Sequence, residues 1–591
     1  MYGFATRDEN WELPVESQVL GFLDLDEEQQ EGTFRLQLPA QPTGTPVKVG
    51  ESTTGVQVFA VGYSPNLTGG PFSEGDDRSR GWPTYLASTV NDPEQDGEVT
   101  GGKLIIWAPD ANQEFPTGFG NDNKLLTDDD PVGSVPQGYS VIDLDQQPFE
   151  IIRDPEVQLT LNEPNDAAVK DYSDLSYTEA FQQMFERVRT VYAFNGIENK
   201  EPNYEQLRST LEPRIAEAEQ QEDGEAYYLA LRDFTQAFKD GHVGINDGGR
   251  FEQPLFGERY GSGYGFAIRE MDDDRVIVTY VVENGPAARA GIEVGAEVTA
   301  FNDKPIEEAL RAVEPWNGPF STQFGREYQQ QRFLLRAPLG TEARITFRNG
   351  NDAQETATLR AIAEEESFQV TDPFAFADPA ALPVEYGVLP EGTGYVRVNS
   401  NFDDLNLVVR LWERALSTFE QFRLENVIID MRRNGGGASL GLASYLTDQE
   451  IEMGQLEYYS EATEQFEGRG TPERILPADR QFRFPNMALL VDQFCYSACE
   501  LEAYALSQVP DMLVIGQYPT AGVEAEVARG QFQMPEGISI QVPTGHFVKN
   551  GEIFLEGKGV EPTIRIPIDE DTVSVEEDVV LQRAEEELQN R

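Results

Sequence analysis

A serine stands where an apolar strand is expected to lead into a helix. Residues 487–494 form an apolar run, and the chain continues as Cys495-Tyr496-Ser497-Ala498-Cys499-Glu500 into a helical pattern that reaches Gln508. A hydroxyl at a helix N-terminus can act as a nucleophile, because the helix field and the unpaired N–H groups favour developing negative charge. The alternative is structural. Ser-x-x-Glu is also a capping box, in which Ser497 and Glu500 would only start the helix.

Three consecutive glycines follow a second predicted strand end. The strand over residues 426–432 leads into Asn434-Gly435-Gly436-Gly437, and a helix is expected from there to Leu446. Glycines present backbone N–H groups without a Cβ in the way, which suits an oxyanion hole. A tight turn with positive φ would need only one or two glycines, so the run of three favours the oxyanion interpretation.

The chain has two histidines, and either could be the general base that takes the serine proton. His242 follows a helical segment in Asp240-Gly241-His242, where Gly241 is expected to cap the helix. His546 lies in a predicted strand and hairpin. A lone histidine after a helix can also be a capping or surface residue.

Other candidate groups lie near the serine or after it. Lys549 and Lys558 are the two lysines that follow Ser497, and both lie in other segments. Cys495 and Cys499 flank the serine but have no histidine pair beside them, so we expect small buried hydrophobic side chains and not metal or redox ligands. Two cysteines also provide no disulfide framework.

The composition narrows the classes of partner. The 591 residues include 104 Asp and Glu against 45 Lys and Arg, a net charge of −59. Such a surface repels nucleic-acid phosphates and anionic lipid headgroups, so neither is expected as a partner. No apolar run reaches the roughly 20 residues of a membrane span. No signal peptide is visible, which leaves a cytosolic chain or the mature form of an exported protein.

Four regions are predicted along the chain. Residues 1–165 alternate short apolar runs with Gly, Pro, Asn and Asp clusters, which indicates an all-β accessory domain. Residues 172–247 have helical spacing and predict a small helical bundle that ends in the sequence DGHV. Residues 255–365 return to strands. Residues 366–591 alternate strands with helices, which predicts an α/β layer with a largely parallel sheet.

The third region strongly resembles a PDZ domain of the bacterial protease type. The resemblance rests on Gly263-Tyr264-Gly265-Phe266 and on the segment GPAARAGIEVGAEVTAFND over residues 285–303. It implies that the N–H groups of this four-residue loop bind the C-terminal carboxylate of a peptide, while the next strand edge pairs with the peptide backbone.

The order of motifs resembles the tail-specific (C-terminal processing) serine peptidase family. From about residue 175 the chain has a bundle ending in DGHV, the PDZ-like region, strand–DMRRNGGG–helix, strand–CYSACE–helix and then LEGKGVEPTI. The resemblance implies a ClpP/crotonase-like α/β peptidase core. It also implies Ser497 as nucleophile, with the N–H groups of Gly436 and Ala498 as oxyanion donors. It requires no cofactor and no metal.

The family divides by its general base. One branch uses a lysine after a Thr-x-Gly turn, but here the turn reads Thr520-Ala521-Gly522-Val523, so that lysine is absent. The other branch has a tricorn-type core and implies His242 as the base and Glu556, in LEGKGVEP, as the group that orients it. That branch can carry a serine directly before the histidine, where this chain has Gly241. Taken alone, Glu556 would be a solvated carboxylate.

These observations predict a secreted or periplasmic serine endopeptidase that cleaves peptides or unfolded proteins, with the PDZ domain capturing their C-termini. The alternative from another class is a non-catalytic PDZ-containing binding protein with a vestigial peptidase core. A third interpretation is a transporter-associated or signalling accessory that uses the first domain to localise the enzyme.

Overall fold

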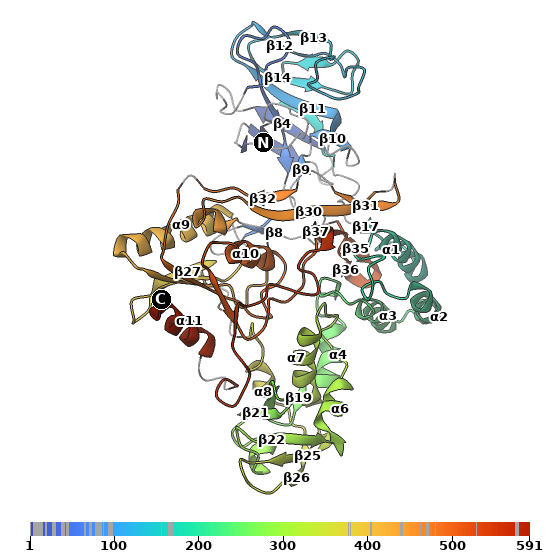
Figure 1. Cartoon of the computed structure of the whole chain (residues 1–591). Helices are drawn as coiled ribbons and strands as arrows, with labels where there is room; N and C mark the ends of the chain where they lie inside the picture. The colour runs from blue at the N-terminus through green and yellow to red at the C-terminus, as the bar shows by residue number, and fades with distance from the viewer. Residues whose placement is uncertain are drawn as a thin grey trace.

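A computed structural model describes most of the chain, and its elements are labelled in Figure 1. The described residues are 98–591 with short gaps, together with shorter stretches before residue 93. The gaps are 155, 163–169, 376–377, 379, 402–404, 438–440, 461–462, 469–471, 479, 528 and 574–577. The earlier stretches are 2–3, 16–17, 21–25, 31–36, 42, 46–63, 67–69, 74–76, 85–86 and 88–92.

The described part of the first 165 residues consists of antiparallel strands, as the turn-rich pattern predicts. The largest sheet has the order β15-β14-β11-β5-β1-β2, with β10 paired to β11. Its strands are β1 (Tyr2–Gly3), β2 (Glu16–Ser17), β5 (Gln57–Ala60), β10 (Thr89–Asp92), β11 (Glu98–Ala108), β14 (Gly138–Asp143) and β15 (Glu150–Ile152). A second sheet joins β3 (Gly21–Leu25), β4 (Glu31–Leu36) and β16 (Glu156–Thr160). Separate two-stranded pairs are formed by β6 (Gly62–Tyr63) with β9 (Tyr85–Leu86), β7 (Leu67–Gly69) with β8 (Glu74–Asp76), and β12 (Gln113–Pro116) with β13 (Val132–Val135).

The helical bundle shares its core with a β-hairpin from much later in the chain. Its helices are α1 (Tyr177–Val191), α2 (Tyr204–Gln221) and α3 (Gly224–Gln236). The strands β17 (Lys170–Asp171) and β18 (Gly244–Asn246) join β35 (Gln531–Met534) and β36 (Ile538–Gln541) in one sheet. Phe181 and Phe234 pack in one buried cluster with Phe532 and Ile540. The bundle is therefore attached to the C-terminal region through a common hydrophobic core. Because α3 ends at Gln236 and is capped by Ala237, the prediction that Gly241 caps it is wrong.

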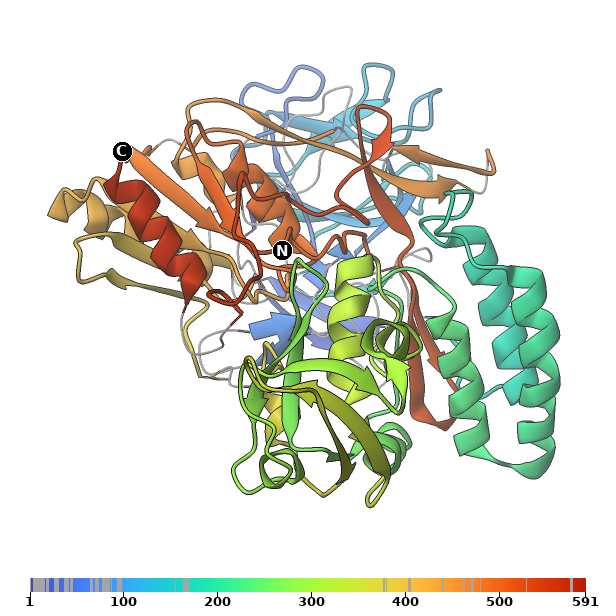
Figure 2. The same ribbon diagram turned by 60° about the horizontal axis from the view of Figure 1, so that its bottom comes forward.

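The PDZ-like region is a sheet with the order β20-β21-β22-β25-β26, in which β20 is an edge strand. Its strands are β20 (Phe266–Glu270), β21 (Val276–Val281), β22 (Glu297–Phe301), β23 (Lys304–Pro305), β25 (Glu342–Arg348) and β26 (Glu355–Arg360), with β19 (Ser262–Gly263) paired to β24 (Arg336–Ala337). The helices are α4 (Glu252–Tyr260), α5 (Pro286–Arg289), α6 (Ile306–Arg311), α7 (Gln323–Leu334) and α8 (Glu366–Gln369). Figures 1 and 2 show this region and the helical bundle as two lobes, and Leu255, Trp316 and Phe333 pack into the same buried cluster as the bundle helices.

The last region contains the predicted parallel sheet, with the order β27-β28-β29-β33-β34-β39. All neighbouring pairs are parallel except β27 with β28. The strands are β27 (Val384–Val388), β28 (Gly394–Val398), β29 (Asn426–Asp430), β33 (Asn486–Leu490), β34 (Leu513–Gly516) and β39 (Ile564–Arg565). One face packs on α9 (Leu405–Phe422) and α10 (Ala498–Ser507), and the other on α11 (Val579–Gln589), because successive strand residues alternate between faces.

A second sheet crosses the end of this region. It has the order β31-β30-β37-β38, with β32 paired to β30. Its strands are β30 (Ile451–Ser460), β31 (Gln465–Gly468), β32 (Glu473–Ile475), β37 (Gly545–Lys549) and β38 (Glu552–Ile553).

The expected helix after the three glycines is wrong over the described residues. Only a short 3₁₀ turn forms, at Leu442–Tyr445, and residues 438–440 lie outside the described part. Three glycines and the following Gly441, which has a φ of 67°, disfavour a regular helix there. None of the described helices combines the length and the hydrophobicity needed to cross a lipid bilayer.

Candidate active site

Ser497 lies in a sharp turn between β33 and α10. It is the N-cap residue of α10, with a φ of 60° and a ψ of −136°, a conformation that a residue other than glycine rarely adopts. Its N–H donates to the carbonyl of Val523 at 2.8 Å, and the N–H of Ala521 donates to the carbonyl of Cys495 at 2.9 Å. The turn is therefore held against the segment over residues 521–523.

The capping-box interpretation of Ser497 and Glu500 does not fit this structure. The Ser497 side chain makes no capping hydrogen bond. The buried Glu500 carboxylate instead accepts hydrogen bonds from the Thr520 hydroxyl at 2.7 Å, from the Gly522 N–H at 3.1 Å and from the Val523 N–H at 2.5 Å. Glu500 thus holds the turn over residues 520–523, whose Val523 carbonyl in turn holds Ser497.

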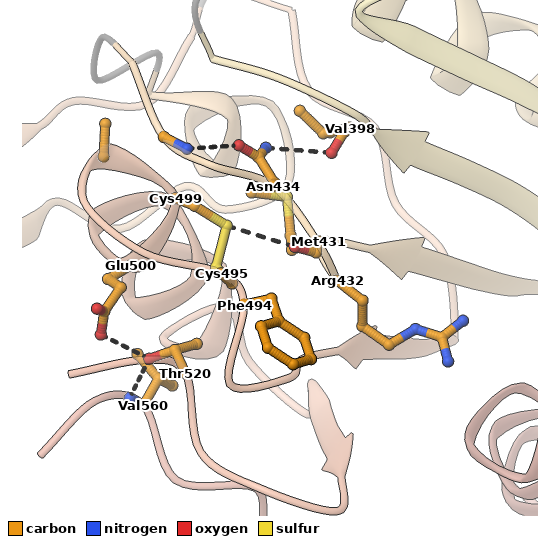
Figure 3. Close-up of a disulfide and its surroundings, with 12 residues drawn as sticks. Val398, Met431, Arg432, Asn434, Phe494, Cys495, Cys499, Glu500, Thr520 and Val560 are labelled. Carbon is orange, nitrogen blue, oxygen red and sulfur yellow. Dashed lines mark hydrogen bonds between the residues drawn. A yellow bond between two sulfur atoms is a disulfide. The ribbon is translucent and has the colours of Figure 1, made fainter. Parts of the chain in front are cut away.

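Cys495 and Cys499 are joined by a disulfide, which corrects the expectation of two separate hydrophobic side chains (Figure 3). Both are fully buried, and their Cα atoms are 5.4 Å apart, within the usual disulfide range of about 4.4–6.8 Å. Their four-residue separation across the start of α10 brings the two side chains together. The bond closes a short loop that contains Ser497, so it restrains both sides of the proposed nucleophile.

The glycine run lies directly against the serine turn. Gly436 has a φ of 82°, and a Cβ added there would lie 2.6 Å from the Tyr496 carbonyl oxygen and 2.7 Å from the Ser497 Cβ. A larger residue would therefore displace the serine. The Gly436 N–H donates to Asn434 Oδ1 at 2.9 Å, so as an oxyanion donor it would have to exchange this bond for one to the substrate. Within the described part of the chain, the Ala498 N–H makes no hydrogen bond.

The loop that carries His242 packs against the same segment over residues 521–523. A Cβ added to Gly241 would lie 3.0 Å from a Val523 methyl carbon, and the Gly241 N–H donates to the Ser321 hydroxyl at 2.9 Å. The His242 N–H donates to Asp240 Oδ1 at 2.9 Å, and His242 as a whole residue is 9% exposed. Val523 therefore contacts both loops, since its carbonyl binds Ser497 and its side chain touches Gly241.

Glu556 is a buried carboxylate with polar partners from three other segments. It forms an ion pair with Lys200, and it accepts a hydrogen bond from the Glu524 N–H at 2.8 Å. The Ser321 hydroxyl, together with these two groups, counteracts the effect of burial, which raises the pKa of Glu556. The pairing of Glu556 with His242 stays a prediction, because the contacts that define Glu556 here are those with Lys200, Ser321 and Glu524.

Four carboxyl groups are buried close enough to affect one another in this area. Burial raises the pKa of Asp240 to about 7 and that of Glu500 to about 8, and the nearby Glu556 carboxylate adds to both shifts. Burial also raises the pKa of Glu524 well above its usual range, with further contributions from Glu500 and Glu556. Lys200 is the cation that opposes this trend for Asp240 and Glu556.

The competing bases have other partners. The His546 ring binds the Ala193 carbonyl and lies 3.5 Å from a Glu457 carboxylate oxygen, and burial lowers its pKa. The Lys549 ammonium donates to the Tyr504 hydroxyl at 2.6 Å. Lys558 is largely exposed and lies 3.6 Å from Glu552. None of these contacts involves the serine turn.

The predicted peptide-binding loop over residues 263–266 runs from β19 into β20. Gly265 has a φ of 79°, and its carbonyl accepts from the Val282 N–H at 2.9 Å. Tyr264 is buried and its carbonyl accepts from the Ala287 N–H, whereas Phe266 starts the edge strand β20. Gly263 is fixed on the other side by paired hydrogen bonds to Ile362.

Sequence reasoning missed Lys200 and Ser321, the two groups that connect the histidine loop to Glu556. The Lys200 ammonium donates to the Lys239 carbonyl at 2.8 Å as well as binding Glu556. Neither residue lies in a recognisable motif, and each comes from a loop far away in the chain. The only signal was charge, because lysine is rare in this sequence.

Among the described residues, one cluster of three carboxylates has its oxygens close enough together to hold a cation. Its members are Asp122, Asp129 and Asp130 in the first region. Their oxygens already accept hydrogen bonds from their own loop, for example from the Gly120 N–H to Asp130 at 2.8 Å. This loop lies in the N-terminal β region and is no part of the serine site.

Two family models and several solved structures are similar to parts of this chain. Residues 392–566 match the model of peptidase family S41, and residues 277–314 match a PDZ domain model. Mature CPAF complexed with lactacystin is 14% identical, with 70% of this chain and 97% of that chain covered and a TM-score of 0.47. The photosystem II D1 C-terminal processing protease is 17% identical, with 67% of this chain and 96% of that chain covered and a TM-score of 0.33. The tricorn protease is 11% identical, with 99% of this chain and 56% of that chain covered and a TM-score of 0.34.

The two model matches fall on the parallel-sheet region that carries Ser497 and on the sheet that follows the Gly263–Phe266 loop. The chain therefore contains a peptidase family S41 domain and a PDZ domain.

Proposed function

We propose that the protein is a serine endopeptidase with Ser497 as nucleophile, His242 as general base and Glu556 as the carboxylate that supports the base. The observation that carries this proposal is the contact of Val523 with both the serine turn and the His242 loop. This contact supports the proposal because it holds the loop that carries His242 against the segment that binds the strained serine turn. A serine nucleophile, a histidine base and a supporting carboxylate are the groups that acyl transfer requires.

The reaction follows from these positions. The Ser497 Oγ attacks the carbonyl carbon of the scissile bond while His242 takes the hydroxyl proton. The carbonyl oxygen becomes an oxyanion at the N-terminus of α10, where the Ala498 N–H and, after exchange, the Gly436 N–H stabilise it. His242 returns the proton to the leaving amine, and an acyl ester remains on Ser497. Water activated by His242 then hydrolyses this ester and regenerates the serine.

Glu556 acts within a group of charges. Its negative charge opposes the positive charge that develops on His242, and the ion pair with Lys200 counteracts the rise of the Glu556 pKa that burial causes. Because Val523 replaces the lysine of the other family branch, a Ser–Lys dyad at that turn is not part of the proposal.

The PDZ domain is proposed to capture the C-termini of peptides or unfolded proteins. A free carboxylate would bind at the loop over residues 263–266, so a peptide amidated at its C-terminus should be cleaved more slowly than its free acid. Equal cleavage rates would remove the PDZ domain from substrate capture. The disulfide between Cys495 and Cys499 supports an extracytoplasmic location, since such bonds persist in oxidising compartments.

Labelling with a fluorophosphonate tests the proposal directly. The serine oxygen displaces fluoride from phosphorus, so we expect the wild-type protein to be labelled and Ser497→Ala to be unlabelled. Ser507→Ala, which changes a serine at the other end of α10, is the matched control and should be labelled like the wild type. Absence of labelling in the wild type, with the fold intact, would favour the non-catalytic binding protein.

A further inference from the structure

The PDZ peptide groove would lie between the edge strand β20 and helix α7. An extended peptide adds to such an edge by strand pairing, with its side chains against the facing helix. Strand β20 pairs with β21 on one side only, and α7 packs along it. Residues from both elements line one small cavity, including Phe266 and Ile268 of β20 and Arg332 of α7.

The chain itself fills this groove. Ser367, Phe368 and Thr371 line the same cavity, and only about 10 Å³ remains. That volume holds no more than about one water molecule. The short helix α8, which begins at Glu366, contacts β20 and lies beside α7 (Figure 1). We call residues 364–371 the groove segment.

The groove segment is bound by two arginines of the α7 side of the groove. The Arg332 guanidinium lies 4.1 Å from the centre of the Phe368 ring, donates to the Phe368 carbonyl at 3.2 Å and donates to the Thr371 hydroxyl at 3.0 Å. Arg336 pairs with Glu364 at 2.8 Å, and the two side chains are only 3% and 7% exposed. The contact of Arg332 with Phe368 is a cation–π interaction, and that of Arg336 with Glu364 is a buried ion pair.

The carboxylate-binding loop beside it has unused donors. Within the described part of the chain, no group accepts a hydrogen bond from the N–H of Tyr264 or Gly265, although both residues are buried. Buried backbone N–H groups are nearly always paired, so this loop is built for a ligand. The Glu364 carboxylate reaches the edge of the loop, since a Cβ added to Gly263 would lie 2.1 Å from it.

We infer that the groove segment is an internal occupant of the PDZ domain, and that a peptide ligand binds only by displacing it. The occupant also indicates the ligand class. A peptide with an aromatic C-terminal residue offers a ring to replace Phe368 at Arg332, and its free carboxylate pairs with the unused N–H groups of Tyr264 and Gly265. This inference rests on the proposed function, because it concerns the groove used there for substrate capture. It is tested by peptide binding and does not depend on catalysis.

The test measures binding to the Ser497→Ala protein, so that no cleavage occurs. The probe is a fluorescein-labelled peptide that ends in phenylalanine with a free carboxylate, followed by fluorescence anisotropy. Phe368→Ala should lower the dissociation constant about tenfold, because the competition from the occupied state is weakened. Leu339→Ala, a 72% exposed position of the same region, is the matched control and should leave it unchanged. The amidated peptide should bind more weakly than the free acid in every variant.

Phe368→Ala can also disturb the packing around the groove. A hydrogen-exchange experiment therefore uses the Ser497→Ala protein, in which the groove segment is unchanged. On saturation with the free-acid peptide, amides of residues 364–371 should exchange faster and those of residues 264–270 more slowly. Binding without faster exchange of residues 364–371, an unchanged dissociation constant in a folded Phe368→Ala variant, or equal binding of the amidated peptide would overturn the inference.

Discussion

The two sides of the proposed active site are stabilised in different ways. On the serine side, Cys495, Ser497, Cys499 and Glu500 lie within six consecutive residues, and a disulfide and backbone hydrogen bonds hold them. On the histidine side, the loop ending at His242 is connected with Glu556 through groups from two further segments, Lys200 and Ser321.

This difference is one of charge as well as of distance along the chain. The serine side depends on covalent and backbone contacts, which pH and salt affect little. The histidine side depends on one partly buried ammonium, that of Lys200, among several buried carboxyl groups, where the loss of this cation leaves a buried carboxylate without its partner. We therefore expect the serine side to resist changes of solvent and the histidine side to respond to them.

The largest expected effect tests whether the two sides form one unit. Ser497→Ala and His242→Ala should each lower kcat by about 10⁴-fold or more, because members of one triad act together. Glu556→Gln should lower kcat by a smaller factor than either of these substitutions. His546→Ala, Lys549→Ala and Lys558→Ala should stay within several-fold of wild type in the same peptidase assay. Activity that survives in His242→Ala but vanishes in Lys549→Ala would restore a displaced Ser–Lys dyad.

The second prediction breaks the histidine side alone. Lys200→Met removes the cation paired with Glu556. We expect the free energy of unfolding to fall by about 3–5 kcal/mol, because the buried Glu556 carboxylate loses its partner. The turnover number should fall about 10²-fold as the His242 loop shifts. Lys239→Met, an exposed neighbour, is the control in thermal unfolding and kinetic assays. Equal stability of the two variants would mean that the ion pair does not support the site.

The third prediction weakens the serine side. Reduction of the disulfide by a dithiol, which is itself oxidised to a disulfide, should slow fluorophosphonate labelling a few-fold because Ser497 loses a restraint. The double variant Cys495→Ala/Cys499→Ala should be labelled at the slower rate with or without the dithiol. If the dithiol slowed labelling of the double variant as well, the effect would come from elsewhere in the protein.

The smallest expected effect is a change of stability with pH. Because the pKa of Asp240 is raised to about 7 and that of Glu500 to about 8, the folded state keeps protons that the unfolded chain releases near pH 4. Stability should therefore fall as pH rises from about 4 to about 8, seen as a Tm a few degrees lower at pH 8 than at pH 5.

Overall charge acts in the same direction, so a comparison of variants isolates the buried groups. Asp240→Asn/Glu500→Gln should show a smaller fall in Tm between pH 5 and pH 8 than the wild type. Asp233→Asn, at an exposed position paired with Arg214, should show the same fall as the wild type. A double variant with an unreduced slope would contradict the assignment to these two carboxyl groups.

Much of the architecture is local enough to be predicted from the sequence. Helical spacing predicted α1, α2 and α3, apolar runs predicted β29 and β33, and the glycine-rich segments predicted the PDZ region that a domain model matches. These features depend on residues a few positions apart, whose side-chain period and turn chemistry act within one element. The serine turn belongs to this class, because a strand, a turn and a helix follow one another directly.

The tertiary structure decided what joins residues distant in the chain. It placed Lys200 on Glu556, put Val523 against Gly241, closed the disulfide around Ser497 and laid Phe368 against the cavity between β20 and α7. Gly241 shows the limit most clearly. The sequence suggested a helix cap, whereas in the structure a Cβ at this position would crowd Val523, far along the chain. Such contacts depend on how complete elements pack, and no periodicity within a segment records them.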